Sequence, residues 1–157
     1  MEELSIDFIH GYLDALSAGC SNVDYVPIYG AEQFSVINDD IRDSLKKHLN
    51  RDYSKRGDIS NYKEIPNDKW KEKLKEYIEK WVDKKYFHGQ AHKLGEIFEN
   101  YKVNYNEELE EFVILFVGKN PNCFRANIEH GDYGYDCEVI GFFGNEKSFY
   151  YYFSFSD

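Results

Sequence analysis

The spacing of apolar residues changes once along this chain, near residue 106, and that change constrains the fold more than any other feature. Before it, apolar side chains recur every three or four residues, as in helices that bury one face. After it, they form short continuous or alternating runs, which are typical of strands. Helices followed by strands predict the α+β class. The 157 residues predict one domain, 1–157, mainly helical over 1–103 and mainly sheet over 104–157.

The first part of the chain is expected to form amphipathic helices. A shorter helix is expected over 90–101, where Gly95 interrupts the pattern. The segment 20–34 is expected to be irregular, and 50–66 is expected to be a polar loop. The three main helices are predicted over 2–18, 36–49 and 67–84.

Four strands are predicted in the last third of the chain, at 112–117, 124–129, 137–143 and 148–156. The first is apolar throughout, as expected of a strand covered on both faces. The last alternates, so one face carries Phe149, Tyr151, Phe153 and Phe155 and the other carries Tyr150 and Tyr152. Short connections predict an antiparallel four-stranded meander with the N-terminal helices packed on one of its faces.

The net charge of −10 is distributed in blocks, with −8 over 1–41, +6 over 42–93 and −8 over 94–157. Phosphate contacts need a dominant basic surface, so a nucleic-acid partner is not expected. The sequence leaves two alternatives for these blocks. They neutralise one another within the fold, or they present an acidic face to a cationic protein partner.

The compartment is inferred from what the sequence lacks. No apolar run approaches 18 residues, so no membrane contact is expected. The N-terminus carries acids where a signal peptide needs positive charge, so a cytoplasmic location is predicted. Cys20, Cys123 and Cys137 are an odd number without CxxC spacing, which argues against a disulfide framework and against a zinc knuckle.

The stretch EHGDYGYDCE, residues 129–138, concentrates four carboxylates and two tyrosines. It lacks the ligand spacing of a calcium loop or a zinc site, so no metal and no cofactor is predicted. A solvated turn and a protein-binding loop remain as alternatives. Aspartates beside tyrosines suit the second, because the rings supply contact area and the carboxylates pair with Arg or Lys. The predicted contact residues are Glu129, Asp132, Tyr133, Tyr135 and Asp136, followed by Asp39 and Asp40.

Tyr150 and Tyr152 are also candidate contact residues. We expect them near Arg125 and Asn127 of a neighbouring strand. If no helix covers their face of the sheet, they form a polar aromatic surface of the composition found at protein interfaces. The sequence leaves open whether that face is covered.

No motif of the chain specifies a reaction. His88, His92 and Glu96 have the i, i+4, i+8 spacing of a helical metal site, but Gly89 stands where a metalloprotease helix carries its Glu base. No GxSxG, GxGxxG or phosphate-binding loop motif occurs. No catalytic residue is therefore predicted, and the chain is not expected to be an enzyme.

In size, charge and aromatic acidic loops, the whole chain resembles bacterial immunity proteins, which bind and block a cognate toxin, often a basic nuclease. The resemblance implies inhibition by occlusion, in which carboxylates engage the cationic patch that a nuclease uses for nucleic acid. It assigns no residue a role, and we expect the inhibitor to be a monomer. Two alternatives remain: a dimeric acidic secretion chaperone that holds an effector segment, and a metal-dependent enzyme that uses His88, His92 and Glu96.

Overall fold

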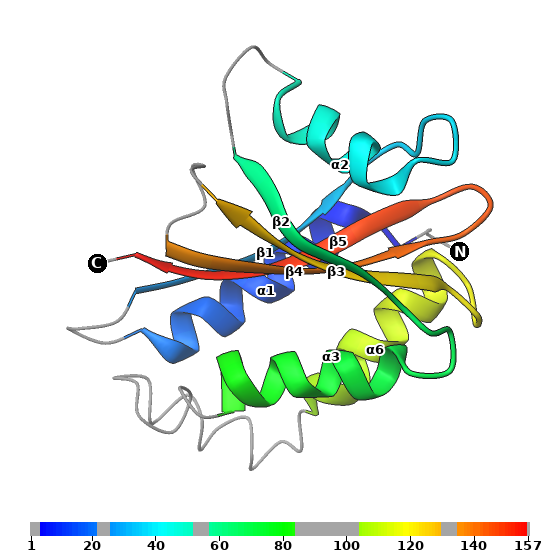
Figure 1. Cartoon of the computed structure of the whole chain (residues 1–157). Coiled ribbons are helices and arrows are strands. Elements are labelled where there is room, and N and C mark those ends of the chain that lie inside the picture. The colour runs from blue at the N-terminus through cyan, green and yellow to red at the C-terminus, as the bar shows by residue number, and fades with distance from the viewer. Residues whose placement is uncertain (1–3, 22–25, 52–56, 84–103, 130–134, 157) are drawn as a thin grey trace.

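The computed structural model describes residues 4–21, 26–51, 57–83, 104–129 and 135–156. They form a five-stranded antiparallel sheet with the order β1-β5-β4-β3-β2 and helices on both faces (Figure 1). None of the described helices combines the length and the apolar character needed to cross a lipid bilayer. The elements in chain order are α1 (Ile6–Cys20), β1 (Val26–Gln33), α2 (Ile41–Leu49), β2 (Asp58–Ile65), α3 (Trp70–Ile78), the π-helical turn η1 (Glu79–Asp83), α6 (Tyr105–Phe116), β3 (Asn122–Glu129), β4 (Tyr135–Phe143) and β5 (Ser148–Ser156).

The α+β class and the antiparallel sheet are confirmed, and so are three helices. The predicted helices at 2–18 and 36–49 are present as α1 and α2, although α2 begins only at Ile41. The predicted helix at 67–84 is present as α3 followed by η1. The helix expected over 90–101 lies outside the described residues.

The two faces of the sheet carry separate buried clusters. Phe149, Tyr151 and Phe153 of β5 lie in the larger cluster, together with residues of α1, α3 and α6. Tyr150 and Tyr152 lie in the smaller cluster, which α2 covers from the opposite side (Figure 1). The predicted alternation of β5 is therefore confirmed. The prediction that helices pack on one face only is wrong, because α2, which lies between β1 and β2 in the chain, covers the second face.

The apolar run 112–117 belongs to α6 and is not a strand. The Asn104 side chain caps this helix by accepting a hydrogen bond from Glu107 N at 3.2 Å. Phe112, Val113 and Phe116 are buried, whereas Leu115 is 63% exposed, so burial follows the helical period. The run looked like a buried strand because Leu115 places an apolar side chain on the outer surface of the helix.

Two strands occur in segments that the sequence predicted to be irregular, and they form the two edges of the sheet. β1 pairs with β5, and β2 pairs with β3. Pro27 and Gly30 give the sequence of β1 the composition of a loop. In β2, a register shift between Ser60 and Lys63 interrupts the pairing with β3. Proline, charge and bulges are characteristic of edge strands. The meander of β3, β4 and β5 was predicted correctly, but the predicted four-stranded sheet is wrong and has five strands.

Side chains of α1 close the outer edge of β1. Tyr29 N donates a hydrogen bond to Ser17 Oγ at 2.9 Å. Two residues further on, His10 Nδ1 lies 3.2 Å from both the N and the O of Ala31. Pro27, two residues before Tyr29, has no N–H to expose. Another strand could therefore not pair with this edge unless α1 moved away.

Candidate functional site

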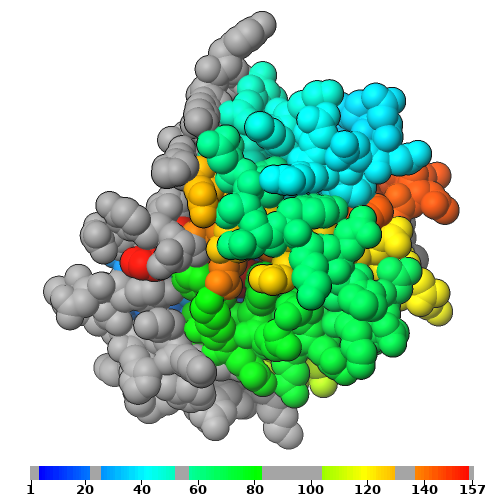
Figure 2. All heavy atoms as spheres, viewed as in Figure 1, coloured from blue at the N-terminus to red at the C-terminus, as the bar shows by residue number. Residues whose placement is uncertain are grey.

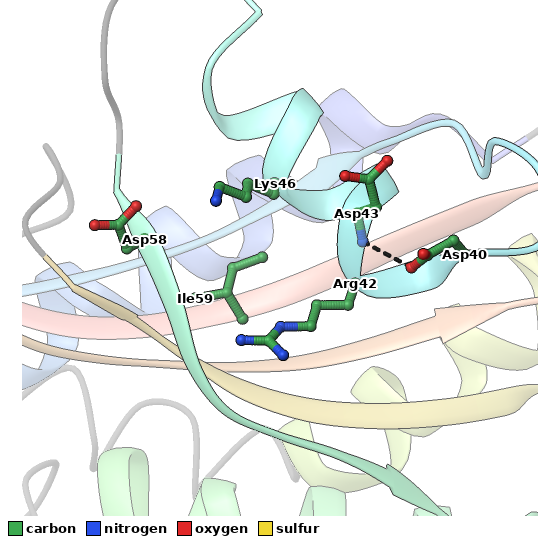
Figure 3. Close-up of a pocket in the computed structure, with 6 residues that line it drawn as sticks. All are labelled: Asp40, Arg42, Asp43, Lys46, Asp58 and Ile59. Carbon is green, nitrogen blue, oxygen red and sulfur yellow. Dashed lines mark hydrogen bonds between the residues drawn. The ribbon is translucent and has the colours of Figure 1, made fainter.

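A charged groove lies between α2 and the beginning of β2. It encloses about 470 Å³ and is lined by Asp40, Arg42, Asp43, Lys46, Asp58 and Ile59 (Figure 3). Figure 2 shows α2 in cyan at the top of one face of the molecule, with β2 and α3 in green beneath it. Figure 3 shows Arg42 and Lys46 extending from the helix on the side of β2. We refer to this feature as the α2–β2 groove.

The charges of α2 reach the groove because the apolar side of the helix is fixed to the sheet. Asp40 begins the helix, since its Oδ1 accepts a hydrogen bond from Asp43 N at 3.0 Å. The helical period then leaves Arg42, Asp43 and Lys46 exposed. The side chains that hold the helix against the sheet are Ile41, Leu45 and Leu49, all of them buried.

Asp58 connects the groove to Glu129, the first residue of the acidic stretch. It lines the groove with Asp40 and lies opposite Glu129 in the pairing of β2 with β3. Ser60 Oγ donates a hydrogen bond to Glu129 Oε1 at 2.9 Å across the same strand pair. Asp39, which precedes the helix cap, is exposed. We call Asp39, Asp40, Asp43, Asp58 and Glu129 the acidic corner. Asp58 lines the groove at the opposite end from Asp40 (Figure 3), and Glu129 adjoins the groove only through its pairing with Asp58.

The acidic corner also contains bases. Among the residues that the structure describes on and next to α2, its five carboxylates stand beside three cations, Arg42, Lys46 and Lys47. Lys47 Nζ lies 3.1 Å from Asp43 Oδ2, with both side chains about half exposed, so this ion pair contributes little to stability. The surplus of carboxylates favours a ligand that brings its own cations.

Tyr62 stands beside the groove and was not predicted as a site residue. Its ring stacks on Phe124 with the ring centroids 5.5 Å apart. Burial first, and then the Glu64 and Asp40 carboxylates, raise the pKa of Tyr62 to about 12 against the opposing charge of Arg42. The hydroxyl is therefore neutral near pH 7 and can donate a hydrogen bond. No feature of the sequence pointed to Tyr62, because its strand was expected to be a loop.

Several predicted site residues fall outside the described part of the chain. Asp132 and Tyr133 lie there entirely. Tyr135 and Asp136 belong to the start of β4, but their side chains are not among those described. The metal-site alternative at His88, His92 and Glu96 also lies outside the described residues. These predictions stay predictions.

Tyr150 and Tyr152 are not surface contact residues. They are 0% and 7% exposed, because α2 covers their face of the sheet. They also do not lie beside Arg125 and Asn127. Tyr150 is opposite Gly141, which is opposite Phe124, so these tyrosines share a face with the even-numbered residues of β3. Tyr150 and Tyr152 therefore offer a partner almost no exposed surface.

The Tyr150 hydroxyl instead forms part of a polar cluster that the sequence analysis missed. Tyr150 donates a hydrogen bond to Glu32 Oε2. His48 Nε2 lies 3.2 Å from the same oxygen and 3.1 Å from Arg51 Nη1. Arg51 Nη2 lies 3.9 Å from Glu32 Oε1. We call these four residues the Glu32 cluster. It ties the C-terminal end of α2 to β1 and β5, and its members are too far apart in sequence to form a motif.

The described cysteines and acids do not form a reactive centre. Burial first, and then the neighbouring Glu138 and Glu32 carboxylates, raise the pKa of the Cys137 thiol far above its ordinary value. Cys20 and Cys123 are buried as well, and all three are free thiols. Within the described ranges, no group of three or more His, Cys, Asp or Glu side chains is placed to hold a metal ion.

Comparison with known proteins returned no relative. The chain matches no protein-family model, no curated protein and no solved structure.

Proposed function

We propose that this chain is a small acidic inhibitor of the immunity type. It binds a basic protein toxin through the acidic corner and covers the active or substrate-binding surface of that toxin. The observation that supports this most is the position of Asp58, which lines the groove with Asp40 and pairs in register with Glu129. Two groups of predicted contact residues, far apart in the sequence, are therefore linked through Asp58 at one end of the groove.

The chemistry of the corner suits a cationic partner. Carboxylates accept paired hydrogen bonds from an Arg fork, and such charged pairs are shorter and stronger than neutral ones. Tyr62 adds a ring held in place by Phe124, which is the kind of rigid contact group found at interfaces. A nuclease whose cationic patch is occupied in this way can no longer bind the phosphates of its substrate.

The mode of binding predicts its kinetics. Opposite charge on the two surfaces speeds the diffusional encounter, and this acceleration falls as salt is added. Slow dissociation then depends on the pairs that become desolvated in the complex. The groove on α2 also offers cations of its own, so a partner surface that carries some carboxylates is accommodated.

The test compares the wild type with D58N/E129Q, which removes two charges from the acidic corner with little change of shape. Tagged chains capture partners from the producing cell at moderate salt, and the captured protein is identified by mass spectrometry and assayed. We expect the wild type to retain one stoichiometric basic protein and to suppress its activity. D58N/E129Q should associate about three- to tenfold more slowly with that protein, with a weaker salt dependence.

The matched control is E108Q/E111Q, which removes the same number of charges from α6 on the other side of the sheet. It should change the association rate less than about twofold, because charges screened by salt act over about 10 Å. An equal loss in both variants would indicate a net-charge effect and not a site. A captured protein whose activity is unaffected by the chain would reject inhibition.

A further inference from the structure

A second surface, on the opposite side of the sheet from the groove, combines exposed apolar side chains with acids. Phe8 of α1 is 58% exposed and Leu115 of α6 is 63% exposed. The Phe8 and Tyr12 rings both meet the Phe112 ring edge-on, with centroid distances of 5.9 and 5.1 Å. We call the surface formed by Phe8, Tyr12, Phe112 and Leu115 the α1–α6 face.

Helical geometry places these residues on facing sides of the two helices. Phe8 and Tyr12 are four residues apart, so they lie one above the other on α1. Glu108, Phe112 and Leu115 follow one another at spacings of four and three, so they share one side of α6. The Phe8 and Tyr12 rings thus meet α6 at Phe112, while Glu108 and Leu115 lie on the same side of α6, one turn before and one turn after Phe112.

The two helices that form this face carry acidic charges only. Residues 4–21 and 104–117 contain no Lys or Arg, and they carry Asp7, Asp14, Glu107, Glu108, Glu110 and Glu111. Burial first, and then the neighbouring Glu108 carboxylate, raise the pKa of Tyr12, so one carboxylate lies next to the Tyr12 ring. Lys147 lines a cavity together with Leu115, but its ammonium group lies 4.8 Å from the centre of the Phe116 ring.

We propose that the α1–α6 face docks a basic amphipathic helix of a partner protein. Ridges of side chains on two neighbouring helices form a groove that receives a third helix, whose apolar residues at i, i+3 and i+4 pack against exposed anchors. Lys or Arg on the flanks of that helix would meet Glu108 and Glu111, which lie on the same side of α6 as Leu115. A second copy of this chain is the poorer occupant, because two-fold pairing would place the acids of one copy against those of the other.

This inference does not depend on the proposed inhibitor function, since the two surfaces lie on opposite sides of the sheet (Figure 1). The probe is a synthetic fluorescent peptide with Leu at helical i, i+3, i+4 spacing and Lys at the remaining positions. A peptide with Glu in place of Lys, and one with the same residues in scrambled order, serve as controls. Binding is measured by fluorescence anisotropy at moderate salt.

We expect the wild type to bind the Leu/Lys peptide in the micromolar range and to bind neither control peptide measurably. F8A/L115A should weaken binding at least about tenfold, and E108Q/E111Q about threefold or more. D58N/E129Q, which removes two charges at the acidic corner, should change binding less than about twofold. If F8A/L115A fails to fold, E108Q/E111Q still distinguishes the two surfaces.

Three results would overturn the proposal. The first is a wild type that does not bind the Leu/Lys peptide. The second is equal weakening by E108Q/E111Q and D58N/E129Q, which would indicate attraction to net charge alone. The third is unchanged binding by a folded F8A/L115A variant, which would show that Phe8 and Leu115 are not anchors.

Discussion

The two faces of the sheet are covered by different means. On the larger face, α1, α3 and α6 enclose a cluster rich in aromatic rings, such as the Phe149 and Tyr151 pair with centroids 5.1 Å apart. On the smaller face, the nine-residue α2 covers fewer side chains and is tied to the sheet by the polar Glu32 cluster. An isolated helix of this length is not stable in water, so α2 depends on these contacts for its position.

The difference separates the part of the molecule that buries most of its apolar surface from the part that carries the proposed binding surface. The larger face buries most of the apolar surface, and the hydrophobic effect scales with that area. The smaller face leaves one side of α2 accessible, and that side carries the charged residues of the α2–β2 groove. A short helix fixed by a few contacts can thus present charge without a large apolar surface of its own.

The largest effect is expected on the larger face. Phe149→Ala removes a fully buried ring that contacts Phe142, Phe116 and Tyr151. The free energy of unfolding should fall by about 3–5 kcal/mol, since the ring leaves a cavity that its neighbours fill only partly. Denaturant unfolding followed by circular dichroism measures this loss. A loss below about 1 kcal/mol would contradict the view that this face holds the fold together.

The next effect sharpens the comparison. Leu45→Ala removes a fully buried side chain of α2 from the smaller cluster and should cost about 3 kcal/mol. Hydrogen exchange should show faster exchange in α2 than in α1 or α6, because the single helix opens before the larger face does. If Leu45→Ala instead speeds hydrogen exchange equally in α1, α2 and α6, both faces of the sheet unfold as one unit.

A smaller loss is expected from the hydroxyl of the Glu32 cluster. Tyr150→Phe removes the hydrogen bond to the Glu32 carboxylate and should cost about 1.5–3 kcal/mol, since bonds to charged groups are the stronger ones. Tyr151→Phe on the larger face is the matched control, because that hydroxyl donates to the neutral Leu109 carbonyl at 2.8 Å. Its loss should be about 1 kcal/mol. The reverse order of the two melting temperatures would contradict the role given to Glu32.

The smallest effect concerns pH. The pKa of Tyr62, about 12, lies above its ordinary value of 10.0, so the folded chain keeps this proton to higher pH than the unfolded chain. The contribution of Tyr62 is complete below about pH 10 and is lost as the pH rises toward 12. Tyr62→Phe should therefore flatten the fall in stability between these values. Absorbance titration of tyrosinate and unfolding at several pH values test this, and an unchanged slope would contradict it.

Most of the helices were predictable because each shows one apolar stripe along its own sequence, as in α2. The edge strands were not, because an edge needs little apolar surface. Lys63 and Glu64 of β2 are exposed, and the backbone N of the buried Pro27 lies on the side of β1 away from β5, where no donor to the sheet is needed. In α6, the outward Leu115 made the apolar run 112–117 resemble a strand. Only the pattern of burial, in which Leu115 is exposed, distinguishes the helix from a strand.

Local composition pointed to some residues of the candidate site but not to those whose position depends on the pairing of strands. Asp40 and Glu129 were recognised as candidate contact residues from local composition alone. Asp58, which connects them, was not predicted, because its segment was expected to be a loop and its position follows only from the pairing of β2 with β3. Tyr150 and Tyr152 were misplaced because the sequence of β5 specifies which face they take but not which helix covers that face.

The most direct test of the account is hydrogen exchange of the chain alone and in complex with its captured partner, read residue by residue. The account predicts slower exchange on binding in two segments, α2 and the start of β2 at 58–60, where the α2–β2 groove lies. Exchange in α1 and α6 should be unchanged by a partner that uses the acidic corner. Protection confined to α1 and α6, with none in α2 or β2, would contradict the proposed site.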